Sequence, residues 1–212
     1  MLTWIRRGIW VVLLTALAAL LHYTLPDRDI VYITNTYNRL VTPGANSIFW
    51  ASPDLGSDEV AGRVQRDVLF IEAARPNGSV RVYRNEDTGW IWPPYFKFDS
   101  SNLQAEARNL ISTSENPKWV AVRHYGWRIP FLSIFPNAVS ITPVEGPDVR
   151  LIPWFNIVFL TLLFALFWAI RVRWLRFRNR RIRPAVEAID ATVDETAAGV
   201  KRWFSGWGRR QR

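Results

Sequence analysis

The sequence predicts an α+β protein, in which a small mixed extramembrane domain lies between two transmembrane helices and a C-terminal amphipathic helix follows. Two apolar runs without a formally charged residue, at residues 9–25 and 152–170, predict the transmembrane helices. The intervening residues 26–151 combine strand-like alternation with one helical pattern, which predicts the α+β domain. Near the C-terminus, apolar residues recur at spacings of three and four, which predicts the amphipathic helix.

The first apolar run, residues 9–25, is about 26 Å long as a helix with a rise of about 1.5 Å per residue. That length is just sufficient for a thin hydrocarbon core. A cleaved signal peptide is the alternative. However, no small-x-small cleavage site follows the run, where His22 and Pro26 stand. We therefore expect an uncleaved signal anchor.

The second run, residues 152–170, is longer, and a helix of this length without a charge is unusual in a soluble core. Pro153 suits the first turn of a helix, where its missing N–H has no consequence. Trp154 and Trp168 stand near opposite ends of the run, as interfacial aromatic residues do. We expect the Asn156 amide to form a hydrogen bond near the outer interface or to contact a partner helix.

Charge predicts the orientation. Residues 1–8 contain Arg6 and Arg7, and seven arginines follow the second run: Arg171, Arg173, Arg176, Arg178, Arg180, Arg181 and Arg183. By the positive-inside rule, residues 1–8 and 171–212 are cytoplasmic, and residues 26–151 are periplasmic in a bacterial inner membrane. We expect the seven arginines to contact anionic lipid headgroups rather than nucleic acid, because they follow a span directly.

The net charge of +9 does not extend to the central domain, where residues 27–150 hold 13 basic and 14 acidic residues. Nucleic-acid binding by this domain is therefore not expected. The chain has no cysteine, which excludes disulfides, zinc-thiolate sites and cysteine nucleophiles. Its two histidines are too few for a histidine-based metal cluster, so we expect neither a metal nor a cofactor.

The first half of the central domain reads as strands. Residues 29–41 alternate β-branched and aromatic residues, and residues 42–62 carry three glycines and two prolines, which favours a long loop. Residues 68–74 and 80–84 predict a hairpin with a type I′ turn at Asn77-Gly78. Asn77 also begins a glycosylation sequon, but the turn already accounts for these residues.

The second half contains one helix and two strands. Ser101 and Gln104 have the spacing of a capping box, which predicts a helix with Leu103, Ala107 and Leu110 on one face. Residues 118–129 alternate as a strand that bends at Gly126, and residues 138–144 predict the last strand.

An aromatic segment precedes the predicted helix, since five of the nine residues 90–98 are aromatic. Prolines at its centre favour an extended, kinked path, so one face can fill the core while the other is exposed. The candidates for a binding surface are this segment, the acidic residues before it and one histidine: Trp90, Trp92, Tyr95, Phe96, Glu86, Asp87 and His124.

Each candidate polar residue also has a structural explanation. Glu86, Asp87 and Asp99 could act as the acid and base of a glycan hydrolase. Turn formation by residues 84–89 and capping of the next helix explain the same residues better. His124 shares a strand face with the neighbouring valines, so we expect it to be partly buried and structural.

The C-terminal tail is outside these patterns. Apolar residues between 186 and 204 have helical spacing, with acidic residues in the first half and basic residues near the end, as the helix dipole favours. Trp203, Phe204 and Trp207 could anchor such a helix on the membrane surface. Packing on a partner protein is the alternative.

Two long blocks carry a resemblance. "VYRNEDTGWIWPPYFKFDSSNLQAEA" and "NPKWVAVRHYGWRI", with "FPNAVSI" after it, resemble the signature blocks of an uncharacterised family of bacterial membrane proteins, found mainly in alphaproteobacteria and catalogued as a domain of unknown function. The resemblance covers both spans and the domain between them. It implies a Gram-negative inner-membrane protein and no particular activity.

Without a catalytic set, we expect a non-enzymatic inner-membrane protein whose periplasmic domain binds another envelope protein, as an accessory or assembly subunit of a membrane complex. The expected partners are therefore a membrane protein and anionic lipid. A periplasmic ligand sensor or envelope-stress sensor is the first alternative, and it predicts a concave pocket lined by Trp90, Trp92 and Tyr95. The glycan hydrolase is the second alternative.

Overall fold

A computed structural model describes residues 2–41, 58–60, 63–89, 93–182, 184 and 195–198. The chain divides into two compact units, Met1–Asn156 and Ile157–Arg212. The first unit contains a long helix and a strand-rich domain with one helix on it, so the predicted α+β class is confirmed.

Helix α1 (Leu2–Thr24) begins seven residues before the predicted apolar run, because the N-terminal residues continue the same helix. Its stretch Thr3–Thr24 is long and apolar enough to cross a membrane, and none of its most apolar window is buried against the rest of the protein. The Thr24 hydroxyl donates a 2.8 Å hydrogen bond to the carbonyl of Leu20 in the last turn. The first strand begins at Asp27, only three residues after the helix.

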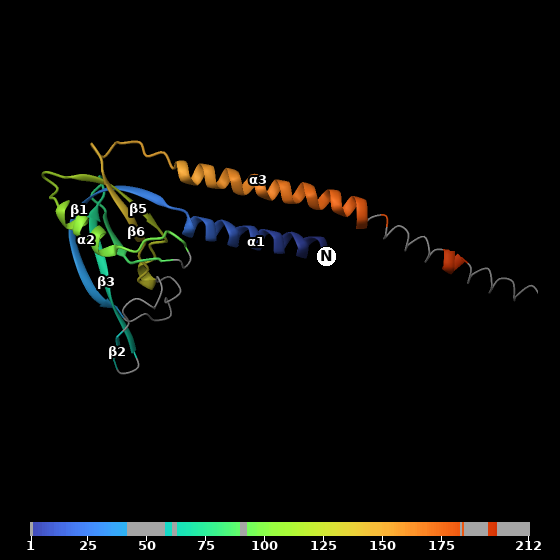
Figure 1. Ribbon diagram of the computed structural model, residues 1–212, viewed down its shortest axis with the longest axis horizontal. Helices are drawn as coiled ribbons and strands as arrows, with labels where there is room; N and C mark the ends of the chain where they lie inside the picture. The colour runs from blue at the N-terminus through green and yellow to red at the C-terminus, as the bar shows by residue number, and fades with distance from the viewer. Residues whose placement is uncertain are drawn as a thin grey trace, which may run out of the picture. The chain divides into compact units, whose positions relative to one another are not determined.

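Five strands of the domain close into a barrel (Figure 1): β1 (Asp27–Val41), β3 (Arg63–Ala74), β4 (Val80–Asn85), β5 (Trp119–Tyr125) and β6 (Asn137–Pro143). The first half of β1 pairs antiparallel with β5 and the second half with β3. β3 then pairs with β4, and β5 pairs with β6. A parallel contact between Arg84 of β4 and Asn137 of β6 completes the ring.

This strand order, with a helix between β4 and β5, is the arrangement of an OB-fold, a five-stranded, partly open Greek-key barrel. Closure depends on β1, which must reach partners on both of its edges. Its register against β3 shifts between Ile33 and Asn35, where a bulge at Thr34 bends the strand. The barrel was not predicted, because the strand patterns do not specify which strands pair.

A sixth strand among the described residues, β2 (Asp58–Val60), pairs with the first residues of β3. The prediction of a loop over residues 42–62 is therefore wrong for these three residues. Antiparallel pairing supplies them with the hydrogen bonds that a loop would leave to water. The remainder of that predicted loop lies outside the described residues.

The predicted β3–β4 hairpin is confirmed, but its turn is not type I′. The amide of Gly78 donates to the carbonyl of Arg75, and Gly78 has a φ of +78°. Asn77 is not among the residues with positive φ, whereas a type I′ turn needs positive φ at both central positions. The Asn77 side chain instead accepts hydrogen bonds from the amide and the hydroxyl of Ser79, which stabilise the alternative turn.

Helix α2 (Ser100–Asn109) lies against the barrel, and Leu103 and Ala107 enter the core as predicted. The predicted capping box is wrong, because Asp99 accepts the hydrogen bond from the amide of Asn102. Gln104 is buried and donates to the carbonyl of Phe70, so its side chain is unavailable for capping.

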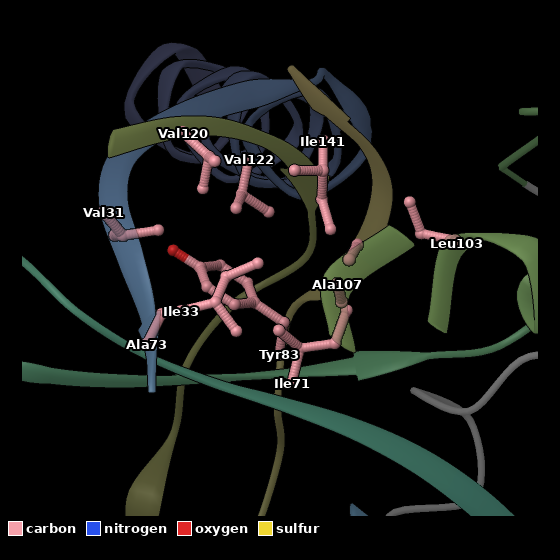
Figure 2. Packing of buried hydrophobic residues seen from close by; sticks show 11 residues of the cluster. Val31, Ile33, Ile71, Ala73, Tyr83, Leu103, Ala107, Val120, Val122 and Ile141 are labelled. Carbon is pink, nitrogen blue, oxygen red and sulfur yellow. The ribbon is translucent and has the colours of Figure 1, made fainter. Parts of the chain in front are cut away.

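The barrel interior is small and aliphatic (Figure 2). Side chains from β1, β3, β4, β5, β6 and α2 point toward one another around the ring of Tyr83. The core consists of Val31, Ile33, Ile71, Ala73, Tyr83, Leu103, Ala107, Val120, Val122, Ala138 and Ile141. The one hydroxyl within this set belongs to Tyr83, so its hydrogen-bond partner defines a polar end of the core.

Helix α3 (Trp154–Phe177) begins with three residues of the first unit, Trp154–Asn156, and its remainder belongs to the second unit, where it continues as a short π-helical segment, Arg178–Ile182. It confirms the predicted second apolar helix, which is also long and apolar enough to cross a membrane. The helix continues past the predicted end, so the first arginines of the basic cluster belong to its last turns. Arg183 and most of the predicted tail helix lie outside the described residues, and residues 195–198 are helical.

Candidate functional site

The predicted binding surface is only partly described, because Trp90 and Trp92 lie outside the described residues. Tyr95 stacks on Tyr125 with ring centroids 4.7 Å apart, and its hydroxyl donates to the carbonyl of Thr24. The aromatic segment is thereby attached to the end of α1. Phe96 is 53% exposed and has a φ of +51°.

The carboxylates of the hydrolase hypothesis are each engaged in local structure. Glu86 lies 3.1 Å from the guanidinium of Arg84, with both side chains largely buried. Asp87 accepts hydrogen bonds of 2.8 and 2.7 Å from the amide and hydroxyl of Ser100, at the start of α2. Asp99 caps that helix. These contacts favour the structural explanation over acid-base chemistry.

Lys97 is a buried cation that the sequence patterns did not single out. Its ammonium donates to the Asn85 side chain and, over 2.8 Å, to the carbonyl of Ala138. Burial lowers its pKa to about 7, while the charges of Asp87 and Glu86 act in the opposite direction. Lys97 therefore fastens the aromatic segment to β4 and β6.

A second polar cluster surrounds Asp29, at the start of β1. Its carboxylate accepts hydrogen bonds from Tyr83 at 2.7 Å and Arg75 at 2.8 Å, and Nε2 of His124 lies 3.1 Å away. Nε of Arg81 is 3.3 Å from the same carboxylate. Burial alone would raise the pKa of Asp29, but the hydrogen bonds from His124, Tyr83 and Arg75 hold it well below its usual value.

His124 is 3% exposed, and it lies on the face of β5 that was predicted from the alternation. Because the Asp29 carboxylate is ionised, Nε2 of His124 carries the hydrogen of their contact. Nδ1 is buried and has no hydrogen-bond partner among the described residues. The histidine is thus oriented by Asp29 while one ring nitrogen remains available.

A cavity of about 520 Å³ lies beside this cluster. Its lining comes from the last turn of α1, the start of β1, β4, the end of β5 with the residues after it, and the first turn of α3. The polar side chains in this lining include His22, Asp27, Arg81, His124, Trp127, Arg128 and Asn156. Its volume is within the range of ligand sites, roughly 300–1,000 Å³. We call this site, defined by those residues, the junction cavity.

Aromatic contacts hold α1 against the rim of the junction cavity. Nε1 of Trp127 donates a 2.8 Å hydrogen bond to Nδ1 of His22, and the rings of Trp127 and Tyr23 meet edge to face. Gly126 has a φ of +91°, and its amide donates to the carbonyl of Tyr23. The bend that was predicted at Gly126 therefore brings the chain after β5 against the last turn of the helix.

Two arginines give the cavity a positive charge. Arg81 shares the Asp29 carboxylate with Arg75. Arg128 donates to the carbonyl of Ile134 and lies over the ring of Phe135, but among the described residues it forms no ion pair. Burial and the nearby charge of Arg81 both lower the pKa of Arg128.

Asn156 contacts the short segment between α1 and β1, because its amide donates a 2.9 Å hydrogen bond to the carbonyl of Pro26. This contact confirms the hydrogen-bonding role predicted for Asn156. Its Oδ1 is buried without a hydrogen-bond partner among the described residues. The lining thus retains unused acceptor capacity at Asn156 and an unused ring nitrogen at His124. No group of three or more acidic, histidine or cysteine residues in the described part of the chain could hold a metal ion.

Comparison with known proteins places the chain in a family. A family model described as "Protein of unknown function (DUF1523)" matches residues 2–178. The chain belongs to this family. It is also similar to an uncharacterized protein of Haemophilus influenzae, with 34% identity over 145 residues, which cover 67% of this chain and 77% of that protein. No solved structure matches the chain.

The DUF1523 match spans α1, the barrel and α3, so the junction cavity lies wholly within the shared region. Of the predicted site residues that the structure describes, His124 alone lines this cavity. Tyr95 and Phe96 belong to the aromatic segment, Glu86 and Asp87 follow β4, and the described arginines belong to α3 and the π-helical segment after it. Sequence reasoning missed Asp29, Arg81 and Arg128, although a carboxylate at the start of an apolar strand was a signal that could have been used.

Proposed function

We propose that this DUF1523 protein is a non-enzymatic, two-span inner-membrane protein that senses a ligand at the junction cavity. Both termini are cytoplasmic, the barrel is periplasmic, and α1 and α3 are the spans. This orientation is supported by the arginines near the start of α1 and near the end of α3, the two ends that would face the cytoplasm. The composition of the two apolar helices supports the spans themselves.

The main support for this proposal is that residues from both helices and from the barrel line the same cavity. His22 comes from the last turn of α1 and Asn156 from the first turn of α3, while Arg81, His124 and Arg128 come from the barrel and the residues after β5. A ligand in the cavity would contact α1, α3 and the barrel at once. If it binds one arrangement of these three parts more tightly than another, it stabilises that arrangement by the difference in affinity. The spans would then transmit that difference to the cytoplasmic arginines and tail, which contact anionic headgroups.

An enzymatic function has less support. The carboxylates of the hydrolase hypothesis are occupied by Arg84, Ser100 and Asn102. His124 has an orienting carboxylate, but no serine or threonine in the described part of the chain lines the cavity beside it. Binding without covalent chemistry is therefore the simpler function for this site.

Docking of another envelope protein is the second candidate, and exposed phenylalanines favour it. Phe131 is 85% exposed at a short 3₁₀ turn, Pro130–Leu132, and Phe98 is 58% exposed. Aromatic side chains of this kind are enriched at protein interfaces. In this case the protein would be an accessory or assembly subunit, as the sequence also suggested.

Orientation is tested with single cysteines, because the chain has none of its own. A membrane-impermeant maleimide added to cells with a permeabilised outer membrane should label Asn77→Cys, at the exposed hairpin turn. Thr3→Cys, near the start of α1, should be labelled only after the inner membrane is disrupted. Labelling of Thr3→Cys in intact spheroplasts, or protection of Asn77→Cys, contradicts the proposed orientation.

The ligand is tested by native mass spectrometry of the full chain released from mild detergent. Sensing predicts a small non-protein molecule bound to the chain, and protein docking predicts a defined protein complex. A cysteine-reactive crosslinker at Phe131→Cys separates the candidates further. A single discrete adduct that is lost in a companion Phe98→Ser variant supports docking, and a bare monomer in every detergent contradicts both candidates.

A further inference from the structure

The junction cavity combines features that select one class of ligand, and this inference rests on the proposed two-span function. In the proposed orientation, the last turn of α1 and the first turn of α3 are at the outer surface of the inner membrane. His22, Trp127 and Asn156 line the cavity at that level. Trp127 and its neighbour Tyr23 are amphipathic residues of the kind that accumulate among lipid headgroups.

The charges in and beside the cavity are not balanced. Arg75, Arg81 and Arg128 are cationic, and Asp27 and Asp29 are anionic, which leaves one positive charge with neutral histidines. Arg75 and Arg81 both contact Asp29, whereas Asp27 forms no ion pair among the described residues. An anion with a single negative charge between Arg81 and Arg128 would remove their mutual repulsion.

The unused hydrogen-bonding groups suit the same ligand. Arg81 has no described partner except Asp29, and Arg128 uses one nitrogen for a carbonyl, so both guanidiniums retain donors. Guanidinium forks match the oxygens of a phosphate group. Oδ1 of Asn156 and the carboxylate of Asp27 are acceptors, which can receive the hydroxyl or ammonium group that many headgroups carry beside the phosphate.

We propose that the junction cavity binds the phosphate group of a phospholipid headgroup, with Arg81 and Arg128 holding the phosphate oxygens. Asn156 and Asp27 receive the polar end of the headgroup. His124, oriented by Asp29, faces the same ligand from the barrel side. Free inorganic phosphate offers the same chemistry without the acyl chains, so the two sources need separate tests.

Binding is measured on the full chain in detergent by native mass spectrometry. The probes are phosphatidylglycerol, phosphatidylethanolamine and inorganic phosphate. Arg128→Gln should weaken binding of at least one phospholipid about tenfold. The matched control, Arg108→Gln on the exposed face of α2, should change the affinity less than twofold. If the phosphate group in the cavity belongs to a lipid, inorganic phosphate should displace the phospholipid only weakly. If inorganic phosphate competes as strongly as the lipid headgroup, the site binds a free anion.

Arg128→Gln also removes a carbonyl contact and a stacking contact, so a variant with the opposite effect is needed. Asp27→Asn removes a negative charge from the lining, keeps an oxygen acceptor for a hydroxyl, and should tighten binding of phosphatidylglycerol, which carries no ammonium, several-fold. An unfolded protein cannot produce that gain. Equal binding by the wild type, Arg128→Gln and Asp27→Asn would mean that lipid merely coats the apolar helices, and it overturns the proposal.

The outcome is separable from that of the proposed function. Binding in detergent does not depend on the orientation of the chain in a membrane, which the cysteine experiment determines. If cysteine labelling shows the proposed orientation but lipid binding does not depend on the charges of the cavity, only the phosphate site is contradicted. Charge-dependent binding with the opposite orientation retains the phosphate site and removes the periplasmic sensor.

Discussion

Nε2 of His124 lies 3.1 Å from Oδ2 of Asp29, and this contact joins the start of β1 to the end of β5 inside the closed barrel. The same carboxylate receives the hydroxyl of Tyr83, whose pKa burial raises well above its usual value, so the phenol remains a donor. Two guanidiniums complete its surroundings. Asp29 therefore contacts four side chains, which come from two strands, β4 and β5, and from the β3–β4 turn.

Asp29→Asn should destabilise the barrel by about 3 kcal/mol, because it removes the charge that several buried donors share. The pKa of Asp29 is depressed in the folded chain, so its contribution is present above the unfolded pKa of about 3.8 and is lost as the pH falls below it. Thermal unfolding of the full chain in detergent, followed by near-ultraviolet circular dichroism, measures the difference between wild type and variant.

That difference should be largest near neutral pH and should shrink as the pH falls below about 4. Asp67→Asn is the control, since Asp67 is exposed and accepts one hydrogen bond, from Asn38. A wild-type-to-variant difference that stays constant down to about pH 2.5 contradicts the assignment of Asp29 as a buried, charged acceptor.

Lys97 should make stability rise with pH a second time, in an alkaline window. Its pKa falls to about 7 in the folded chain, whereas the unfolded chain keeps a pKa near 10.5. Between these values the unfolded chain binds a proton that the folded chain lacks, so stability rises with pH through this window and is flat below it.

Lys97→Met removes this slope because methionine has no proton to exchange. The Tm of the wild type minus the Tm of Lys97→Met should therefore increase between about pH 6.5 and about pH 9.5. Lys118→Met, at an exposed position before β5, should leave the slope unchanged. Parallel pH curves for wild type and Lys97→Met would show that Lys97 titrates normally.

Gly126→Ala should destabilise the junction between α1 and the barrel by about 1–2 kcal/mol, because its φ of +91° is strained for any residue with a Cβ. Space is not the reason, since the nearest atom to an added Cβ would be the Tyr23 ring at 3.6 Å. Gly146→Ala is the matched control, with nothing within 4 Å and an expected change below about 0.5 kcal/mol. Equal Tm values for the two variants would contradict a conformational requirement at Gly126.

The sequence predicted elements well and their assembly poorly. Alternation identified β1, β5 and the hairpin, and the apolar face of α2 followed from Leu103 and Ala107. Closure of the barrel depends on pairings such as Asp27 with His124, which are far apart in the chain and leave no local signal.

The candidate site was also hard to predict, because its residues come together only in the fold. His124 was singled out because it is rare, but its partner Asp29 and the arginines of the cavity look like ordinary strand and loop charges in the sequence. Lys97 stands among aromatic residues, where a solvated cation is the usual expectation. Only the fold shows that it lies beneath them, against Asn85 and Ala138.

The pairing of β1 has a consequence for how the chain is made. In the proposed orientation α1 enters the membrane first, and β1 emerges directly behind it. The edge of β1 that begins at Asp27 has no partner until β5 has been exported, nearly a hundred residues later. The nascent domain therefore waits at the translocation site with an open strand edge. Export of residues up to Tyr125 gives this edge its partner, and export of β6 up to Pro143 is the step that permits the barrel to close.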